Sequence, residues 1–157
     1  MGFPTPTIDI LPEENIALIS SFFIRLFIIV QEYNNTMHGI SIAEELLRNI
    51  EKEAEKQGAK KVKEIYIEVG KLLFPEPSEL EEIFRILAED SIARDAKLVI
   101  TQVKVKGKCS NGHEQEITLS EDFDPHAPAF FTCNICGEEL EIESGKEVKL
   151  MKLVIEK

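Results

Sequence analysis

Three cysteines and a histidine in the second half of the chain form its clearest chemical pattern. Cys133 and Cys136 are two residues apart and precede Gly137, the arrangement of a knuckle in which one tight turn presents two thiolates. A structural zinc ion takes four ligands in a tetrahedron, so a second pair must come from elsewhere. Cys109 and His113 are the obvious donors. The first pair of ligands then has the spacing C-x3-H, and the second pair, Cys133 and Cys136, has the spacing C-x2-C. The spacing therefore predicts a structural zinc site formed by Cys109, His113, Cys133 and Cys136.

Reduced cysteines that merely pack in a small core are the main alternative. The segment has few large apolar residues apart from Phe123, Phe130 and Phe131, so it needs a cross-link, and zinc can contribute ~10–16 kcal/mol to folding. Disulfides are disfavoured because the cysteine count of three is odd and no secretory signal is evident. We therefore expect thiolates free for metal in the reducing cytoplasm.

A catalytic zinc is also disfavoured. The nucleobase deaminase pattern needs H-x-E followed later by P-C-x-x-C. Here Gln115 lies two residues after His113, and Thr132 precedes Cys133. With no phosphate loop and no G-x-S-x-G elsewhere, the sequence predicts no enzyme.

The negative charge of the chain is concentrated around the cysteines. Of the formal net charge of −11, residues 107–145 contribute −8, from nine acids and one base. Nucleic acid backbones bind through Lys and Arg, so such a segment repels them. We expect no nucleic-acid partner.

The first 36 residues are harder to interpret. Residues 17–30 are almost wholly apolar, but this run is shorter than the ~20 residues of a membrane span. Glu13 and Glu14 precede it where a signal peptide would have basic residues. A buried or interface helix is one interpretation. Another is a segment upstream of the true start, because Met37 opens a self-sufficient pattern. No membrane association is expected.

Periodicities from Met37 onward predict two helices and three strands. A first helix has Ser41 and Glu44 as its capping residues and ends at Gly58. A half-buried strand covers residues 61–70, and a second helix begins at Ser78. Strands follow at residues 98–106, where Val99, Val103 and Val105 share a face, and at 148–154.

This order predicts a small α/β (α+β-like) protein with two layers. Two helices cover a three-stranded mixed sheet, whose first two strands are parallel because a helix connects them. The zinc-ribbon-like knuckle module is inserted before the last strand. The expected organisation is an extension (1–36), an α/β domain (37–106 and 146–157) and a zinc-binding domain (107–145).

Several short segments together resemble the HypA family of hydrogenase nickel-incorporation proteins. They are Met-His at 37–38, Glu-Val-Gly-Lys-Leu at 68–72, Pro-x-x-Leu at 77–80, and a zinc insert before a final strand. The resemblance covers residues 37–157. Family members usually have an acidic residue directly after Met-His. They also have the motif Val-Gly-Glu-Leu and four cysteines that bind zinc. Here Gly39, Lys71 and the proposed ligand His113 depart from that pattern.

The resemblance implies a non-enzymatic nickel metallochaperone for nickel–iron hydrogenase maturation. Its nickel site would include His38, with a separate structural zinc, and its partners would be a HypB-type GTPase and the hydrogenase large subunit. An imidazole beside backbone nitrogens also suits nickel(II) chemically. His126 is a candidate further ligand, although a solvated loop histidine is favoured there. The alternative function is a zinc-ribbon adaptor that docks partners without carrying nickel.

Overall fold

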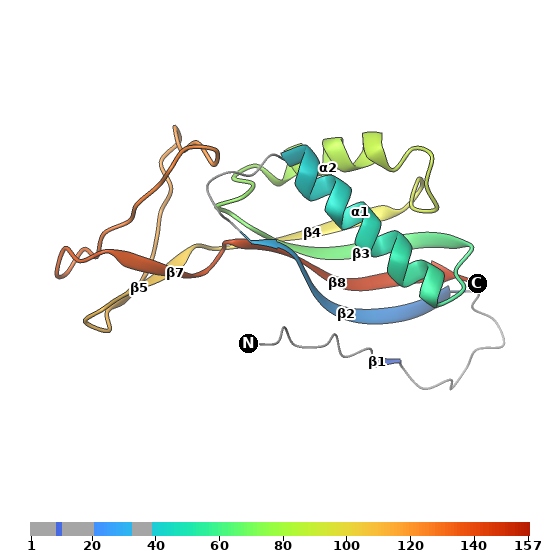
Figure 1. Ribbon diagram of the computed structural model, residues 1–157, viewed down its shortest axis with the longest axis horizontal. Coiled ribbons are helices and arrows are strands. Elements are labelled where there is room, and N and C mark those ends of the chain that lie inside the picture. Colours follow the sequence, from blue (N-terminus) through green and yellow to red (C-terminus); the bar gives the residue numbers. More distant parts are fainter. Residues whose placement is uncertain (1–8, 11–20, 33–38) are drawn as a thin grey trace.

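The computed structural model describes residues 9–10, 21–32 and 39–157. Two helices lie on one face of a five-stranded sheet, and a three-stranded sheet projects from one end (Figure 1). The helices are α1 (Gly39–Lys56) and α2 (Pro77–Leu87). The strands are β1 (Asp9–Ile10), β2 (Ser21–Glu32), β3 (Lys61–Gly70), β4 (Lys97–Val103), β5 (Lys106–Cys109), β6 (Glu114–Glu116), β7 (Leu140–Ser144) and β8 (Glu147–Glu156).

The main sheet has the order β1-β2-β8-β3-β4 and is mixed. β3 pairs in parallel with β4 across the α2 crossover, and β8 runs antiparallel to β3. The two-layer arrangement, the mixed sheet and the parallel first pair are therefore confirmed. We call the two helices and this sheet the body, and residues 107–145 the insert.

The sheet is wider than predicted because β1 and β2 extend it beyond β8. Residues 21–32, where a helix was one interpretation, form the strand β2 and pair antiparallel with β8. The run from Phe22 to Val30 is rich in aromatic and β-branched residues, which favour strands when an edge is open to pair with. Ile28 packs against the main core. The helix interpretation is wrong for these residues.

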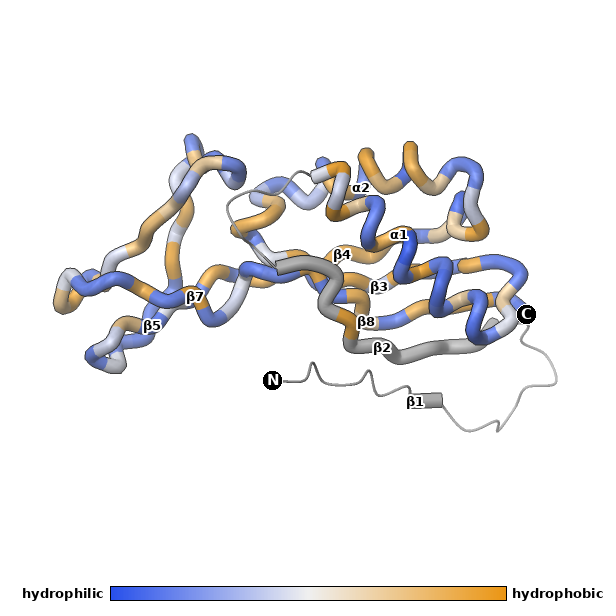
Figure 2. Tube along the Cα trace, viewed as in Figure 1, coloured by the Kyte–Doolittle hydropathy of each residue, from blue (hydrophilic) through white to orange (hydrophobic). Residues whose placement is uncertain are grey.

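The main core lies between the helices and the sheet. Figure 2 shows hydrophobic residues recurring along both helices and along the strands that they cover. Because α1 and α2 each place apolar residues every three or four positions, one face of each is buried. The largest fully buried core side chains are Leu46, Ile50, Ile65, Ile67, Leu80, Leu150, Leu153 and Ile155.

Both helices begin earlier than their predicted caps. α1 starts at Gly39, so Ser41 lies inside the helix. α2 starts at Pro77, with Glu76 as its N-cap and no side-chain capping bond, so Ser78 does not cap it. Proline favours the first helical position because its φ is already fixed and its missing N–H has no helical partner there. Gly58 ends α1 as predicted, with φ 66° and bonds from residues 58 and 59 back to 55 and 54.

The strand predicted at 98–106 is split in two. β4 ends at Val103 and β5 begins at Lys106, so the three valines do not share one face. Val105 is buried in a second core that lies in the insert.

The strand β8 contains an irregularity. A register shift between the pairs Tyr66–Lys152 and Ile67–Leu150 makes Met151 an extra residue.

The insert has its own sheet, in the order β6-β5-β7, and its own core. The body supplies part of that core through Leu72, which lies two residues after the end of β3 and is fully buried. The buried members are Leu72, Val105, Cys109, Ile117, Cys133 and Leu140.

Close backbone packing joins the insert to the body. A Cβ at Gly70 would lie 2.3 Å from the backbone of Gly145, and a Cβ at Gly145 would lie 2.7 Å from the carbonyl oxygen of Lys104. The side chain of Ser144 also donates a hydrogen bond to that carbonyl at 3.0 Å. Glycine is required at both crossing points because any side chain would overlap backbone, which has little freedom to move.

Candidate metal centre

A tight turn between β5 and β6 presents the first pair of candidate ligands. The N–H of Cys109 donates to the carbonyl of His113, and the N–H of Gly112 donates to the carbonyl of Cys109, both at 3.0 Å. Gly112 has φ 86°, a conformation that side chains disfavour. A cysteine at position 112, as C-x-x-C spacing would require, would be strained. The ligand is therefore displaced by one residue to His113.

The second turn lies before β7 and is closed by a different pattern of backbone hydrogen bonds. The N–H of Gly137 donates to the carbonyl of Cys133 at 2.9 Å, and the N–H of Cys133 donates to the carbonyl of Glu138 at 2.7 Å. Here the positive φ of 76° falls on Gly137, one residue after Cys136. The N–H of Ile135 points to the Cys133 sulfur at 3.4 Å. This turn thus presents two sulfurs and a donor to one of them.

The two turns bring all four predicted ligands together. The sulfurs of Cys109, Cys133 and Cys136 and a ring nitrogen of His113 all lie within 4.8 Å of one another. Nδ1 of His113 lies 3.4 Å from the Cys109 sulfur and 3.6 Å from the Cys133 sulfur. The sulfurs of Cys109 and Cys136 are 3.7 Å apart.

These distances fit a tetrahedral zinc ion. Typical zinc–sulfur and zinc–nitrogen bonds give tetrahedron edges of about 3.8 Å between two sulfurs and about 3.6 Å between sulfur and nitrogen. The separations of 3.7 Å and of 3.4–3.6 Å match both edges. Nδ1 is the nitrogen that faces the sulfurs, so the proton of a ligating neutral imidazole would reside on Nε2.

The cysteines differ in exposure and acidity. Cys109 and Cys133 are buried, whereas Cys136 is exposed. Hydrogen bonding from the Asn111 side chain and then from the Glu138 backbone lowers the pKa of Cys136 to about 6. Burial raises the pKa of Cys109. The thiol of Cys136 therefore ionises at lower pH than that of Cys109, and thiolates are the form that binds metal.

Two polar residues that the sequence pattern did not assign to the centre form hydrogen bonds that support it. Asn111 hydrogen-bonds Cys136, as described above. The side-chain oxygen of Gln115 accepts a hydrogen bond from the N–H of Asn134 at 2.9 Å, which links β6 to the second turn. Asn111 lies in the first turn and Gln115 in β6 just after it, and only the folded geometry shows what they contact.

Of the other two histidines, only His126 lies among the described residues, and it is not part of this group. His126 is exposed, its N–H donates to the Asp124 side chain at 2.8 Å, and it lies outside the four-residue cluster. Met37 and His38, where nickel is expected, lie outside the described residues; α1 begins at the next residue, Gly39.

Along the described segments, every helix is too short or too polar to cross a bilayer.

The chain is similar to known proteins over residues 37–155. That span matches the family model described as hydrogenase/urease nickel incorporation, metallochaperone, hypA. The hydrogenase maturation factor HypA of Psychromonas ingrahamii is 34% identical over 121 residues, covering 76% of this chain and 99% of that protein. The protein of the same name from Methanocaldococcus jannaschii is 33% identical over 126 residues, covering 76% and 98%.

A solved structure has a similar fold. The solution structure of the nickel metallochaperone HypA from Helicobacter pylori aligns with a TM-score of 0.53 and 25% sequence identity. The alignment covers 74% of this chain and 96% of that one. Because the family model spans well over half of the chain, the chain belongs to the HypA family of nickel metallochaperones for hydrogenase maturation.

Proposed function

We propose that this protein delivers nickel to the large subunit of a nickel–iron hydrogenase in the cytoplasm. The observation that carries the proposal is the family match, which begins at Met37 and so includes the Met-His pair. His38 is the proposed nickel ligand. A HypB-type GTPase is the proposed partner in the transfer, as membership of the family implies.

The zinc centre has a structural role in this proposal. Four protein donors complete a tetrahedron, whereas catalytic zinc keeps one position open for water or substrate. The centre connects two turns in an insert with a small core, where metal binding contributes directly to folding. Cys109, His113, Cys133 and Cys136 are thus proposed as zinc ligands that stay saturated and do not compete for nickel.

Nickel titration of the full, zinc-loaded chain tests the function. We expect one nickel per chain with affinity that rises with pH, because the imidazole and neighbouring nitrogens must lose protons to bind. His38→Ala is expected to lose nickel binding and keep its zinc. His126→Ala is the matched control, and loss of nickel in that variant would instead identify His126 as a ligand.

Full-length variants are preferable to a truncated chain here. Removing residues 1–36 would also remove β2, which pairs along β8 and contributes Ile28 to the main core. A change in nickel affinity in the truncated chain could then come from altered nickel coordination or from a less stable fold. If the full-length His38→Ala variant binds nickel like its parent, the adaptor that binds zinc alone becomes the better description.

A further inference from the structure

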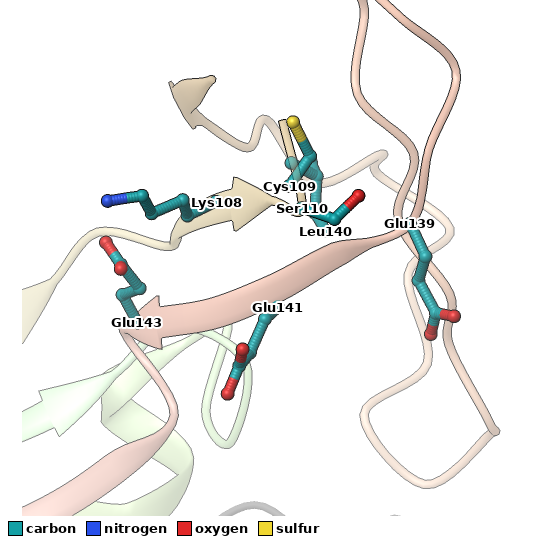
Figure 3. Close-up of a pocket in the computed structure, with 7 residues that line it drawn as sticks. All are labelled: Lys108, Cys109, Ser110, Glu139, Leu140, Glu141 and Glu143. Atoms are coloured by element: carbon teal, nitrogen blue, oxygen red, sulfur yellow. The ribbon is translucent and has the colours of Figure 1, made fainter. Parts of the chain in front are cut away.

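One face of the insert's sheet is buried and the other is uncovered. Along β5 and β7, Cys109 and Leu140 are buried in the insert core. Their neighbours on these strands and at the adjoining strand ends are exposed and line an open hollow of about 400 Å³ (Figure 3). The exposed lining residues are Lys108, Ser110, Glu139, Glu141 and Glu143. We call these five residues the β5–β7 face.

Negative charge on this face is not compensated. The ammonium group of Lys108 forms an ion pair with Glu114 of β6, 3.2 Å away. Within the part of the chain that the structure describes, the carboxylates of Glu139, Glu141 and Glu143 form no ion pair. Carboxylates outside any ion pair therefore repeat at two-residue intervals, at Glu141 and Glu143 on β7 and at Glu139 just before it.

The spacing of these carboxylates decides what kind of cation suits them. Among the described residues, only the Cys/His group brings metal-binding atoms close enough to share an ion. Positions two apart on a strand are about 6.6–6.8 Å apart along its axis. An extended peptide repeats its side chains at the same interval, so basic residues at alternate positions can each meet one carboxylate.

The surroundings favour a protein partner. Residues 107–145 have a formal charge of −8, from nine acids and one base, which attracts cationic segments and repels phosphate backbones. Phe130 and Ile135 of the insert are 77% and 73% exposed, so either could add apolar contact area to a partner bound beside it. The β-bridge between Thr132 and Glu139 places the segment that carries Phe130 next to the face in space.

We propose that the β5–β7 face docks an extended segment of a partner protein that has Lys or Arg at alternate positions. This surface goes beyond the nickel site and does not depend on it. The basic side chains would lie against Glu139, Glu141 and Glu143, and the exposed side chain of Phe130 would add contact area.

A capped hexapeptide of alternating lysine and threonine tests the proposal against the full, zinc-loaded chain. Calorimetry at low salt should show binding, and amide NMR shifts should concentrate at residues 108–110 and 139–143. The triple variant Glu139→Gln, Glu141→Gln, Glu143→Gln should weaken binding about tenfold, since each exposed ion pair contributes a factor of about two to three.

A control with the same change in charge separates docking from general attraction. Glu79, Glu82 and Glu89 are exposed acids in and just after α2, and their conversion to Gln should leave peptide affinity within about twofold of the parent. Equal weakening in the two triple variants, shifts centred elsewhere, or no binding would overturn the proposal. His38→Ala should bind the peptide like the parent, so failure of the nickel site would not be mistaken for failure of this face.

Discussion

The N–H of Leu72 donates a hydrogen bond to the carbonyl of Gly145, 3.0 Å away, where the body meets the insert. The side chain of Leu72 is fully buried in the insert core, and the next residues, Leu73 and Phe74, are buried in the main core. Three consecutive residues thus connect the two cores. The orientation of the insert on the body is fixed by packing, and several consequences can be measured.

Leu72→Ala should destabilise the protein by about 2–5 kcal/mol, because it leaves a cavity at a site that backbone crossings prevent from collapsing. Urea unfolding checks the size of the loss, and a chelator assay should show faster zinc release. Ile86→Ala is the control: that side chain is 73% exposed, and its loss should change stability by less than about 0.5 kcal/mol. Similar losses in the two variants would mean that Leu72 does not join the cores.

Gly145→Ala should destabilise the protein more than Gly58→Ala does. Both glycines have positive φ, 81° and 66°, so an added Cβ strains both by about 1 kcal/mol. Only at Gly145 would the Cβ also overlap backbone, whereas at Gly58 nothing lies within 4 Å. Thermal unfolding of the two variants measures the difference, and equal effects would contradict the tight crossing.

The purified protein should contain one zinc per chain, held by the four residues of the metal centre. In the double variant Cys133→Ser, Cys136→Ser, two of the four donors are lost, so zinc should be released. The insert should loosen while much of the body stays folded, because the main core contains neither residue. Elemental analysis and circular dichroism are the measurements. Stoichiometric zinc in that variant would refute the assignment.

His113→Ala should weaken zinc retention strongly, and His126→Ala should leave it unchanged. The physical reason is position, since Nδ1 of His113 lies 3.4 Å and 3.6 Å from two sulfurs and His126 is outside the cluster. Competition with a coloured chelator gives the relative affinities. If both substitutions weaken zinc alike, the fourth ligand has been misassigned.

In zinc-free protein, Cys136 should be the most reactive thiol near neutral pH. Its lowered pKa of about 6 makes it a thiolate above that pH, and it is the exposed cysteine of the three. Alkylation by iodoacetamide, followed by peptide mass spectrometry, should show a rate that rises through pH 6 and then levels off. Slower reaction at Cys136 than at buried Cys109 would contradict the described environment.

The same lowered pKa has a consequence for folding. A thiolate that is favoured in the folded state stabilises zinc-free protein at pH above the unfolded thiol pKa. That stabilisation is lost as the pH falls toward 6. Asn111→Ala removes the side-chain hydrogen bond that contributes most to the lowered pKa of Cys136, so it should move the pH midpoint of Cys136 alkylation upward.

The sequence by itself determined the local features of this protein. The period of apolar residues placed both helices and the strands β3 and β8, and the connecting helix predicted that β3 and β4 are parallel. The C-x3-H and C-x2-C spacing picked out the four residues whose sulfurs and ring nitrogen the fold brings together. These features depend on residues near one another in the chain or on ligand types that few other functions require.

Only the tertiary structure decided which distant segments meet. Residues 21–32 are strongly apolar under any interpretation, and it is the open edge of β8 that makes them a strand. In the sequence Val105 belongs to a predicted body strand and Leu72 follows another, yet both are buried in the insert core because the chain crosses itself at Gly70 and Gly145. A sequence pattern shows that a side chain is apolar, but the partner that buries it is set by packing between segments far apart in the chain.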